Sequence, residues 1–306
     1  MDFQIVLPGK TIAGKGALSR AGLEKYGKKP LIVTGKHTAK SQAAAELLKY
    51  APGGVVFDGI TGEPTVEMIN AGVAAYHENS CDHVIGVGGG SALDSAKAIA
   101  AMSALGGNIA DYMGKEIDGE FPPMVLIPTT AGTGSEATKF TIITDTEKDI
   151  KMLLKGDKLL PDLAVLDYSY TLSAPKSVTA ATGMDALTHA VEAYVSTDAN
   201  PLTDAAAIKA IDKIVHYLPQ AVANGDYMKA RSEMAYAQYL AGVAFNNASL
   251  GYVHAMAAGR LLQPAPRRVQ RHPAALCPGV QPHRQPGAVR GDRPGHGHQC
   301  GRHVSL

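Results

Sequence analysis

The chain has 306 residues, of which 45% are hydrophobic and 19% are charged, and its formal net charge is +1. A charge so close to zero gives no reason to expect nucleic acid or an anionic membrane as a partner. The N-terminus lacks the basic flank and apolar run of a signal peptide, and no apolar stretch approaches the roughly 20 residues that cross a bilayer. The three cysteines form no CxxC motif, so we expect a globular protein of the reducing cytoplasm.

Short β-branched runs alternate with longer helical stretches over the first 175 residues. The pattern predicts buried strands at 30–34, 54–58, 83–87 and 124–128, with helices at 38–51, 64–80 and 91–105 between them. A further apolar run, 163–167, either closes the same sheet or leads out of it. Strand–helix alternation of this kind is typical of a parallel sheet with helices on both faces.

After residue 175 the strand pattern stops. Helices are predicted at 176–196, 201–224 and 226–248, with Pro201 and Pro219 at their starts and ends. The expected architecture is therefore an α/β nucleotide-type domain at 1–175 followed by an all-α domain at 176–258. A ligand is expected in the cleft between the two.

Residues 259–306 have a composition unlike that of the rest. The first 258 residues contain all 19 lysines and two arginines, whereas the last 48 contain no lysine, eight arginines and seven prolines. No apolar period survives there, and proline recurs too often for any helix. Two interpretations are open: a disordered basic tail, and a frameshift in the gene or its assembly, which we favour.

Three glycines stand between the predicted strand at 83–87 and the helix that follows it. Without Cβ atoms, Gly88, Gly89 and Gly90 let the backbone turn tightly and approach a pyrophosphate, whose charge then faces a helix N-terminus. Such a turn needs no ligand, but its place after a predicted parallel strand favours phosphate binding. The spacing differs from GxGxxG, so we predict no standard Rossmann site.

A second loop, residues 128–136, also follows a predicted strand and is rich in hydroxyl side chains. Thr129, Thr130, Thr133 and Ser135 can hydrogen-bond a ribose or phosphates, although a hydroxyl-rich turn can also cap its own backbone. The occurrence of two such loops in one α/β domain favours a nucleotide site for both.

Asp185 and His189 are four residues apart in a strongly helical stretch, so both side chains project from one helical face. Such a pair is often only a surface hydrogen bond. Here the neighbours are mostly apolar, and burial of two ionisable groups without a partner is costly, which favours a divalent cation. His254 is a third candidate, although a lone histidine on an apolar helix is more often a satisfied core residue.

Together, the sequences GGGSALDSAK at 88–97, PTTAGTGSE at 128–136 and GMDALTHAVEAY at 183–194 resemble the iron-containing alcohol dehydrogenase family over roughly residues 1–257. The resemblance implies an α/β N-terminal dinucleotide-binding domain with a parallel sheet, followed by an all-α metal-binding domain that is incomplete here. It implies that the dinucleotide is bound by Gly88, Gly89, Gly90, Ser91, Asp94, Thr129, Thr130, Thr133 and Ser135, with Lys151 reaching the ribose. Asp185, His189 and His254 would be three of four metal ligands and act in catalysis through the metal.

The implied reaction is hydride transfer between a small primary alcohol or diol, or the corresponding aldehyde, and the nicotinamide of NAD or NADP. The family's ligand set of one carboxylate and three imidazoles suits Fe(II), and Zn(II) also accepts it. The expected partner is a small-molecule alcohol or aldehyde, and we expect the full-length protein to form a homo-oligomer as family members commonly do. The alcohol itself stays open.

The chain departs from the family in two places. Gly35-Lys36 stands where many NAD-using members carry an aspartate, which leaves NADP open. Ala258 and Arg268 stand where the family has a histidine near the substrate and a fourth histidine ligand. The codons of residues 266–271 can encode the family's Pro-His-Gly-Val-Cys-Asn motif in another frame, which supports a frameshift near residue 258.

Because of the second departure, we predict weak activity or none for this chain. A nucleotide-binding pseudoenzyme is therefore one alternative. A lyase of the related dehydroquinate synthase type, which uses NAD only transiently, is another and less favoured one.

Overall fold

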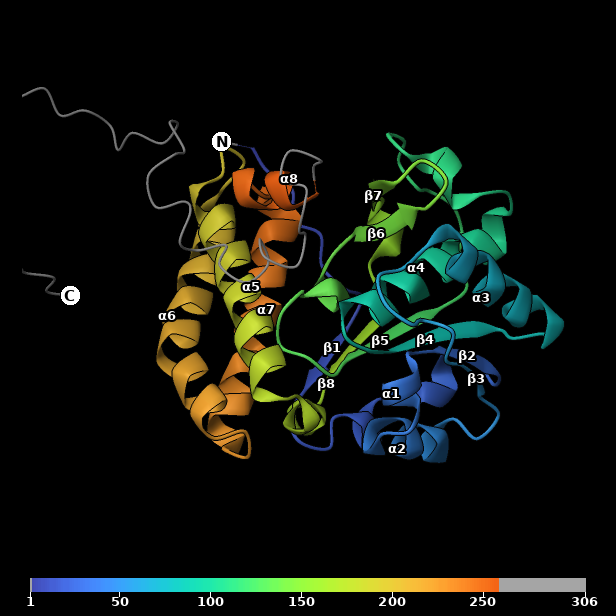
Figure 1. The fold of residues 1–306 in the computed structure, drawn as a ribbon, viewed down its shortest axis with the longest axis horizontal. Helices are drawn as coiled ribbons and strands as arrows, with labels where there is room; N and C mark the ends of the chain where they lie inside the picture. Colours follow the sequence, from blue (N-terminus) through green and yellow to red (C-terminus); the bar gives the residue numbers. More distant parts are fainter. Residues whose placement is uncertain (1, 259–306) are drawn as a thin grey trace, which may run out of the picture.

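The computed structural model of the protein describes residues 2–258. The predicted tail at 259–306 lies outside the described residues, so its disorder and the proposed frameshift stay predictions. Within these residues, eleven named strands and α-helices precede Leu163, and four further α-helices follow the last strand. Figure 1 shows the two groups side by side, with α5, α6 and α7 packed together beside the sheet and α8 at one end of the helical group.

Six strands form one parallel sheet in the order β1-β8-β5-β4-β2-β3. Their bounds are β1 Thr11–Ala13, β2 Pro30–Val33, β3 Val55–Phe57, β4 His83–Gly88, β5 Met124–Pro128 and β8 Leu163–Leu166. The run at 163–167 therefore closes the sheet, since β8 lies between β1 and β5. The four other predicted strands are found within a residue or two of their expected bounds.

Helices cover both faces of this sheet, which is why its strands read as continuous apolar runs. They are α1 Lys36–Ala39, α2 Gln42–Tyr50, α3 Val66–Glu78 and α4 Gly90–Leu105. Successive strand residues point to opposite faces: Leu31 and Val33 belong to the core under α3 and α4, whereas Ile32 belongs to the core that includes Leu47 of α2. The predicted α/β fold with a parallel sheet is confirmed.

Two features of this part differ from the sequence prediction. The helix expected at 38–51 is two helices, because the Ser41 hydroxyl accepts a hydrogen bond from the Ala44 amide and caps a new helix at Gln42. A hairpin that was not predicted, β6 Phe140–Asp145 and β7 Ile150–Lys155, forms a separate antiparallel sheet. It packs beside α4.

The C-terminal part is helical, as predicted, with α5 Lys176–Val195, α6 Pro201–Ala223, α7 Met228–Ala248 and α8 Tyr252–Ala258. Small buried residues such as Ala190, Ala210 and Ala237 line the contact of α5, α6 and α7 and let the helices approach closely. Pro201 starts α6 at a position where a missing amide costs little. Pro219, in contrast, lies inside α6, one turn before its end.

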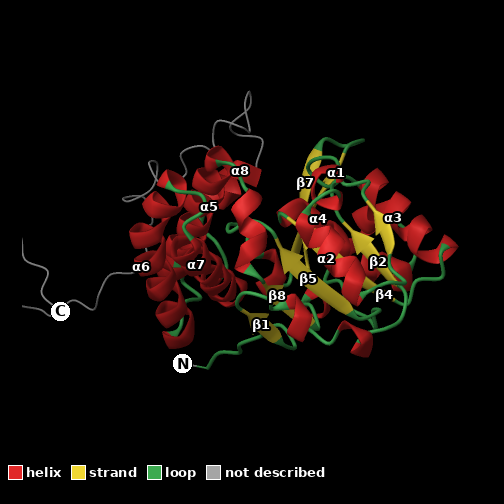
Figure 2. Cartoon of the chain, turned by 90° about the horizontal axis from the view of Figure 1, so that it is seen from below, coloured by secondary structure: helices red, strands yellow, loops and turns green. Residues whose placement is uncertain are grey.

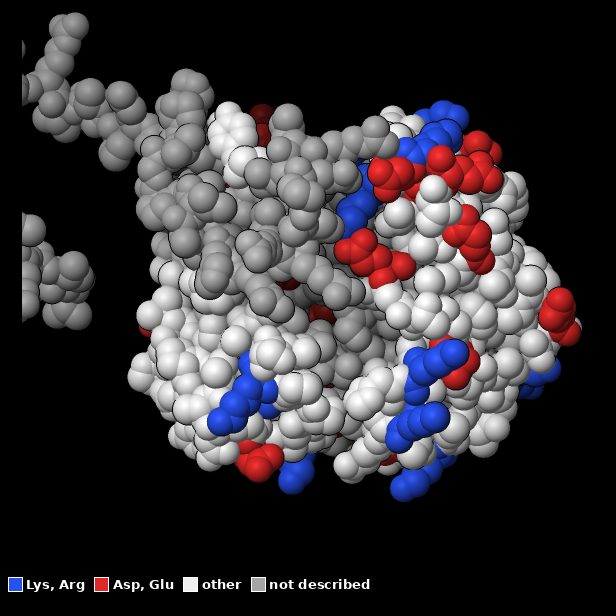
Figure 3. All heavy atoms as spheres, viewed as in Figure 1, with Lys and Arg blue, Asp and Glu red and all other residues white. Residues whose placement is uncertain are grey.

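The helical group meets the sheet at its β1 and β8 edge, as Figure 2 shows from below. Thr11 of β1 and Tyr239 of α7 share a hydrogen bond of 2.6 Å between their hydroxyls. The domain boundaries at 175 and 258 stay predictions. None of the helices within residues 2–258 combines the length and the hydrophobicity that a bilayer crossing requires. On the face drawn in Figure 3, basic and acidic side chains form small separate groups of both signs.

Candidate cofactor and metal site

A cavity of about 360 Å³ opens at the carboxyl ends of β2, β3 and β4. Residues 35–38 after β2, 60–62 after β3 and 88–92 after β4 line it. From β2, the chain continues to β3 on one side of β2 and then crosses to β4 on the other side of β2. Such a reversal of strand order forms the crevice in which open α/β sheets bind ligands.

The glycine-rich loop forms one wall of this cavity and leads into α4. Gly89 is the N-cap residue and has no side chain to cap the first amides of the helix. The Ala92 amide donates to the Gly89 carbonyl at 3.0 Å, whereas the Gly90 and Ser91 amides before it can donate to an anion. Gly88 has a φ of 149°, a backbone conformation that favours glycine. A Cβ atom on Gly90 would lie 2.6 Å from Cγ2 of Thr133. The first loop thus packs directly on the second.

Of the predicted cofactor residues, Gly88, Gly89, Gly90 and Ser91 line the cavity. Thr129, Thr130 and Thr133 are partly exposed on the adjoining loop, and the Thr129 amide donates to the Gly88 carbonyl at 2.8 Å.

The side chains of Asp94 and Ser135 form a hydrogen bond with each other, and Asp94 also accepts one from the hairpin. The Ser135 hydroxyl donates to one carboxylate oxygen of Asp94 at 2.6 Å, and the Ile142 amide donates to the other at 3.1 Å. Both side chains therefore have a structural role between α4 and the hairpin, and their contact with a dinucleotide stays a prediction. Lys151 forms an ion pair of 2.6 Å with Glu63, next to the cavity wall at Gly62.

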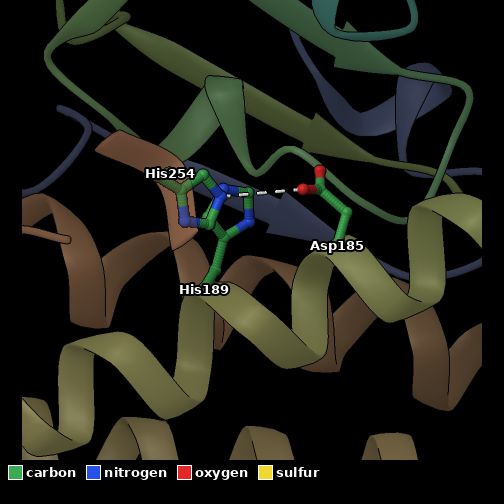
Figure 4. A group of neighbouring side chains, drawn as sticks. All are labelled: Asp185, His189 and His254. Carbon is green, nitrogen blue, oxygen red and sulfur yellow. Dashed lines mark ion pairs between the residues drawn. The ribbon is translucent and has the colours of Figure 1, made fainter. Parts of the chain in front are cut away.

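The three predicted metal ligands come together. Asp185 and His189 project from one face of α5, and His254 reaches them from α8 (Figure 4). One ligand atom from each residue lies within 4.8 Å of the other two. Nε2 of His254 lies 3.7 Å from Oδ1 of Asp185. The His189 ring stacks on the rings of both His254 and Phe245, with centroids 4.4 Å apart in each case.

The environment of these groups favours a cation. Burial lowers the pKa of His189 to about 4, so its ring is neutral at pH 7 and keeps a lone pair. Its buried Nδ1 atom has no hydrogen-bond partner among the described residues. Burial alone would lower the pKa of His254, but its hydrogen bonds with Asp185 and Glu192 outweigh burial and raise it to about 9. Histidine neighbours likewise hold the pKa of Asp185 below its ordinary value although burial opposes this.

The residues present fit a divalent transition metal. Bonds of about 2.0–2.2 Å from one ion place two ligand atoms at most about 4.0–4.4 Å apart, so atoms within 4.8 Å need only small side-chain movements. One carboxylate oxygen and two imidazole nitrogens are a donor set that iron and zinc both accept. The unpartnered Nδ1 of buried His189 is the kind of polar atom that a bound ion would satisfy.

Sequence reasoning missed Glu192, which lies in the same helix motif. It is seven residues after Asp185 and three after His189, so it shares their helical face. The helical spacing therefore carries a signal for Glu192, although spacing alone does not show that its partner is His254. Glu192 is buried and accepts hydrogen bonds from the Val253 amide and from Nδ1 of His254.

Comparisons with known proteins identify the family of the chain. The family model described as iron-containing alcohol dehydrogenase matches residues 8–168, and that of the C-terminal part of the Fe-containing alcohol dehydrogenase family matches residues 179–259. Alcohol dehydrogenase 4 of Schizosaccharomyces pombe is 46% identical over 259 residues, covering 82% of this chain and 61% of the yeast protein. The NAD-dependent methanol dehydrogenase of Bacillus methanolicus is 43% identical over 258 residues, covering 82% and 68%.

A solved structure of 1,3-propanediol oxidoreductase superposes with a TM-score of 0.81 at 43% identity, covering 84% of this chain and 69% of that one. The chain therefore spans less than two thirds of the length of the S. pombe relative and just over two thirds of the other two proteins.

A parallel sheet with a glycine-rich cavity, joined to helices that gather a carboxylate and two imidazoles, fits the class of metal-dependent, nucleotide-linked enzymes. With both family models matched, the chain belongs to the iron-containing alcohol dehydrogenase family. The comparisons support NAD and iron as the cofactors of this family member.

Proposed function

We propose that this protein is a metal-dependent, NAD(P)-linked alcohol dehydrogenase or aldehyde reductase that acts on small primary alcohols or diols. The observation that carries the proposal is the cluster of Asp185, His189 and His254, which offers three ligand atoms within 4.8 Å of one another. The names of the relatives, which include methanol and 1,3-propanediol enzymes, support small alcohols as the substrate class. We expect a cytoplasmic homo-oligomer.

Each part of the chain has a distinct task in this proposal. The free amides at the start of α4 would bind the dinucleotide pyrophosphate, and the second loop would hold its ribose and nicotinamide side. Asp185, His189 and His254 would hold the metal, and the stacked Phe245 ring shields one side of His189 from water. When bound, the metal supplies a Lewis acid for the alcohol oxygen or the aldehyde carbonyl.

A second candidate is a nucleotide-binding protein without turnover. The sequence favours it at two positions, since Ala258 and Arg268 stand where the family has a substrate-side histidine and a fourth ligand. Ala258 ends α8, and Arg268 lies outside the described residues. Three ligands can hold an ion less tightly than four, so this candidate predicts cofactor binding with little or no reaction.

The test is a metal titration of dehydrogenase activity. The purified protein is stripped with a chelator and reloaded anaerobically with Fe(II) or Zn(II), and NADH formation from methanol, ethanol and 1,3-propanediol is followed by absorbance. We expect NADH formation that depends on added metal and falls at least a hundredfold in Asp185→Ala. The matched variant Asp212→Ala, which loses only an exposed ion pair with Lys209, should keep the wild-type rate.

Two results separate the candidates. NADH binding by fluorescence without any metal-dependent turnover would support the second candidate. Undiminished turnover in Asp185→Ala would contradict the proposed metal site.

A further inference from the structure

One carboxylate joins α5 to the third metal-ligand candidate. Glu192 accepts a hydrogen bond from the Val253 amide through Oε1, at 2.6 Å, and pairs with Nδ1 of His254 through Oε2, at 2.5 Å. Its side chain is only 5% exposed. Two consecutive residues of α8 are thus fixed by the same side chain, one through its backbone and one through its ring.

This arrangement decides which ring nitrogen of His254 faces the metal cluster. A carboxylate oxygen only accepts, so Nδ1 of His254 carries the proton that lies between it and Glu192. The opposite nitrogen, Nε2, points towards Asp185, which is 3.7 Å away. A histidine that donates through one nitrogen to a carboxylate presents the other as a more basic ligand in a fixed orientation.

The helix geometry explains how Glu192 reaches this place. Asp185, His189 and Glu192 follow one another at four- and three-residue spacing and share a face of α5. His254 lies across that face on α8, which is a short helix of seven residues. The orientation of the His254 ring therefore depends on contacts with α5 on both of its edges.

We propose that Glu192 is a positioning residue for the metal site: it holds the His254 ring so that Nε2 is directed at the ion. This inference rests on the proposed metal site and adds a residue outside the ligand set. Glu192 is not among the ligand candidates, and both of its oxygens are hydrogen-bonded to α8. Its effect is exerted through His254.

The test compares zinc affinities, measured by competition with a chromophoric chelator, for the wild type and variants. Glu192→Gln has nearly the same shape but cannot accept both hydrogen bonds, and we expect its affinity to fall about 10- to 100-fold. Glu192→Asp keeps the charge on a shorter side chain, and we expect an intermediate affinity. Glu233→Gln is the matched control, since Glu233 is a buried helical carboxylate on α7 that pairs with Lys213 and Lys229. The Glu233→Gln variant should bind zinc with the affinity of the wild type.

Two further readouts separate positioning from a general structural effect. In the His254→Ala background, Glu192→Gln should cause no additional loss of zinc affinity. In 15N-histidine NMR spectra of the zinc-loaded protein, the wild type should show a slowly exchanging Nδ1 proton on His254 that is absent in Glu192→Gln, while NADH affinity stays unchanged.

An unchanged zinc affinity in Glu192→Gln would overturn the inference while leaving the metal site in place. An equal loss in the wild-type and His254→Ala backgrounds would overturn it as well, because the effect would then not pass through His254. A wild type that binds zinc no better than Asp185→Ala would overturn both the metal site and the inference.

Discussion

At Gly90, the close approach of the two loops leads to a stability prediction. In Gly90→Ala, the new Cβ atom would lie 2.6 Å from Cγ2 of Thr133, which is too close. In Gly89→Ala, the atom nearest to the new Cβ would be Oγ1 of Thr130, at 3.5 Å. We expect Gly90→Ala to lower the free energy of unfolding by about 1–3 kcal/mol through overpacking. Gly89→Ala should cost about 0.5–1 kcal/mol, as expected for a poorer N-cap. Urea denaturation measures both, and equal losses would contradict the packing argument.

Lys36 leads to a prediction about cofactor choice. Lys36 and His37 line the cavity, and no acidic residue is found among the described residues that line it. A Cβ on Gly35 would lie 2.8 Å from the Ile60 carbonyl oxygen, so the aspartate of many NAD-using relatives would not fit this backbone. A basic group near the ribose accommodates a 2′-phosphate and an acidic group repels it. Lys36→Glu should therefore weaken NADPH binding at least tenfold more than NADH binding in a fluorescence titration; parallel changes would contradict this.

The residues of the candidate site differ in how far the sequence alone could predict them. Asp185 and His189 could be predicted because metal-ligating side chains at helical spacing are rare in an apolar stretch. His254 needed the resemblance to a known family, since a lone histidine gives no geometric signal. Glu192 and the partners of Asp94 depend on contacts between distant segments, such as the 2.6 Å bond from Ser135 to Asp94, and sequence spacing does not encode them.

At the scale of elements, the strands buried on both faces were the most predictable. Every residue of β2, β4, β5 and β8 is buried. Short, mainly apolar runs of this kind are predicted as strands because they are much shorter than the helical stretches between them. The hairpin of β6 and β7 was missed although buried Thr141 and Ile143 alternate with exposed Ile142. Its turn, Thr146 to Asp149, is charged and lacks the glycine or proline that marks many hairpins. Ser41 broke a predicted helix because a local cap outweighed the apolar pattern.

Lys97 connects α4 to the start of the hairpin, and its burial leads to a prediction about the pH dependence of stability. Its buried ammonium group donates to the carbonyls of Thr138 and Phe140, each at 2.8 Å. Burial lowers the pKa of Lys97 to about 8 from 10.5. Between pH 8 and 10.5 the unfolded chain therefore binds more protons at this residue than the folded chain does, and rising pH favours the folded state.

The difference in unfolding free energy between the wild type and Lys97→Met reports on this residue and on the two carboxyl groups it interacts with, Asp94 and Glu136, because ionisations elsewhere cancel. We expect the difference to shift in favour of the wild type from pH 8 to pH 10.5, by an amount on the order of 1–3 kcal/mol. Urea denaturation at a series of pH values measures it. A difference that stays constant over this range would show that Lys97 titrates alike in both states.

At the scale of the whole molecule, the sheet and the helical group supply different parts of the proposed site. The cavity at the ends of β2, β3 and β4 depends on strand order, and the metal cluster depends on how α8 returns to α5. The cavity could be expected from strand–helix alternation. The metal cluster depends on tertiary packing, and its third member was predicted by resemblance to the family.

The most direct test of the central claim is the zinc stoichiometry of the purified protein, measured by equilibrium dialysis and elemental analysis. We predict one ion per wild-type chain, and less than a tenth of that in His189→Ala at the same free zinc concentration, because both the buried imidazole and its unpartnered Nδ1 are lost. Equal zinc contents in the wild type and His189→Ala would contradict the assignment of Asp185, His189 and His254 as the metal site.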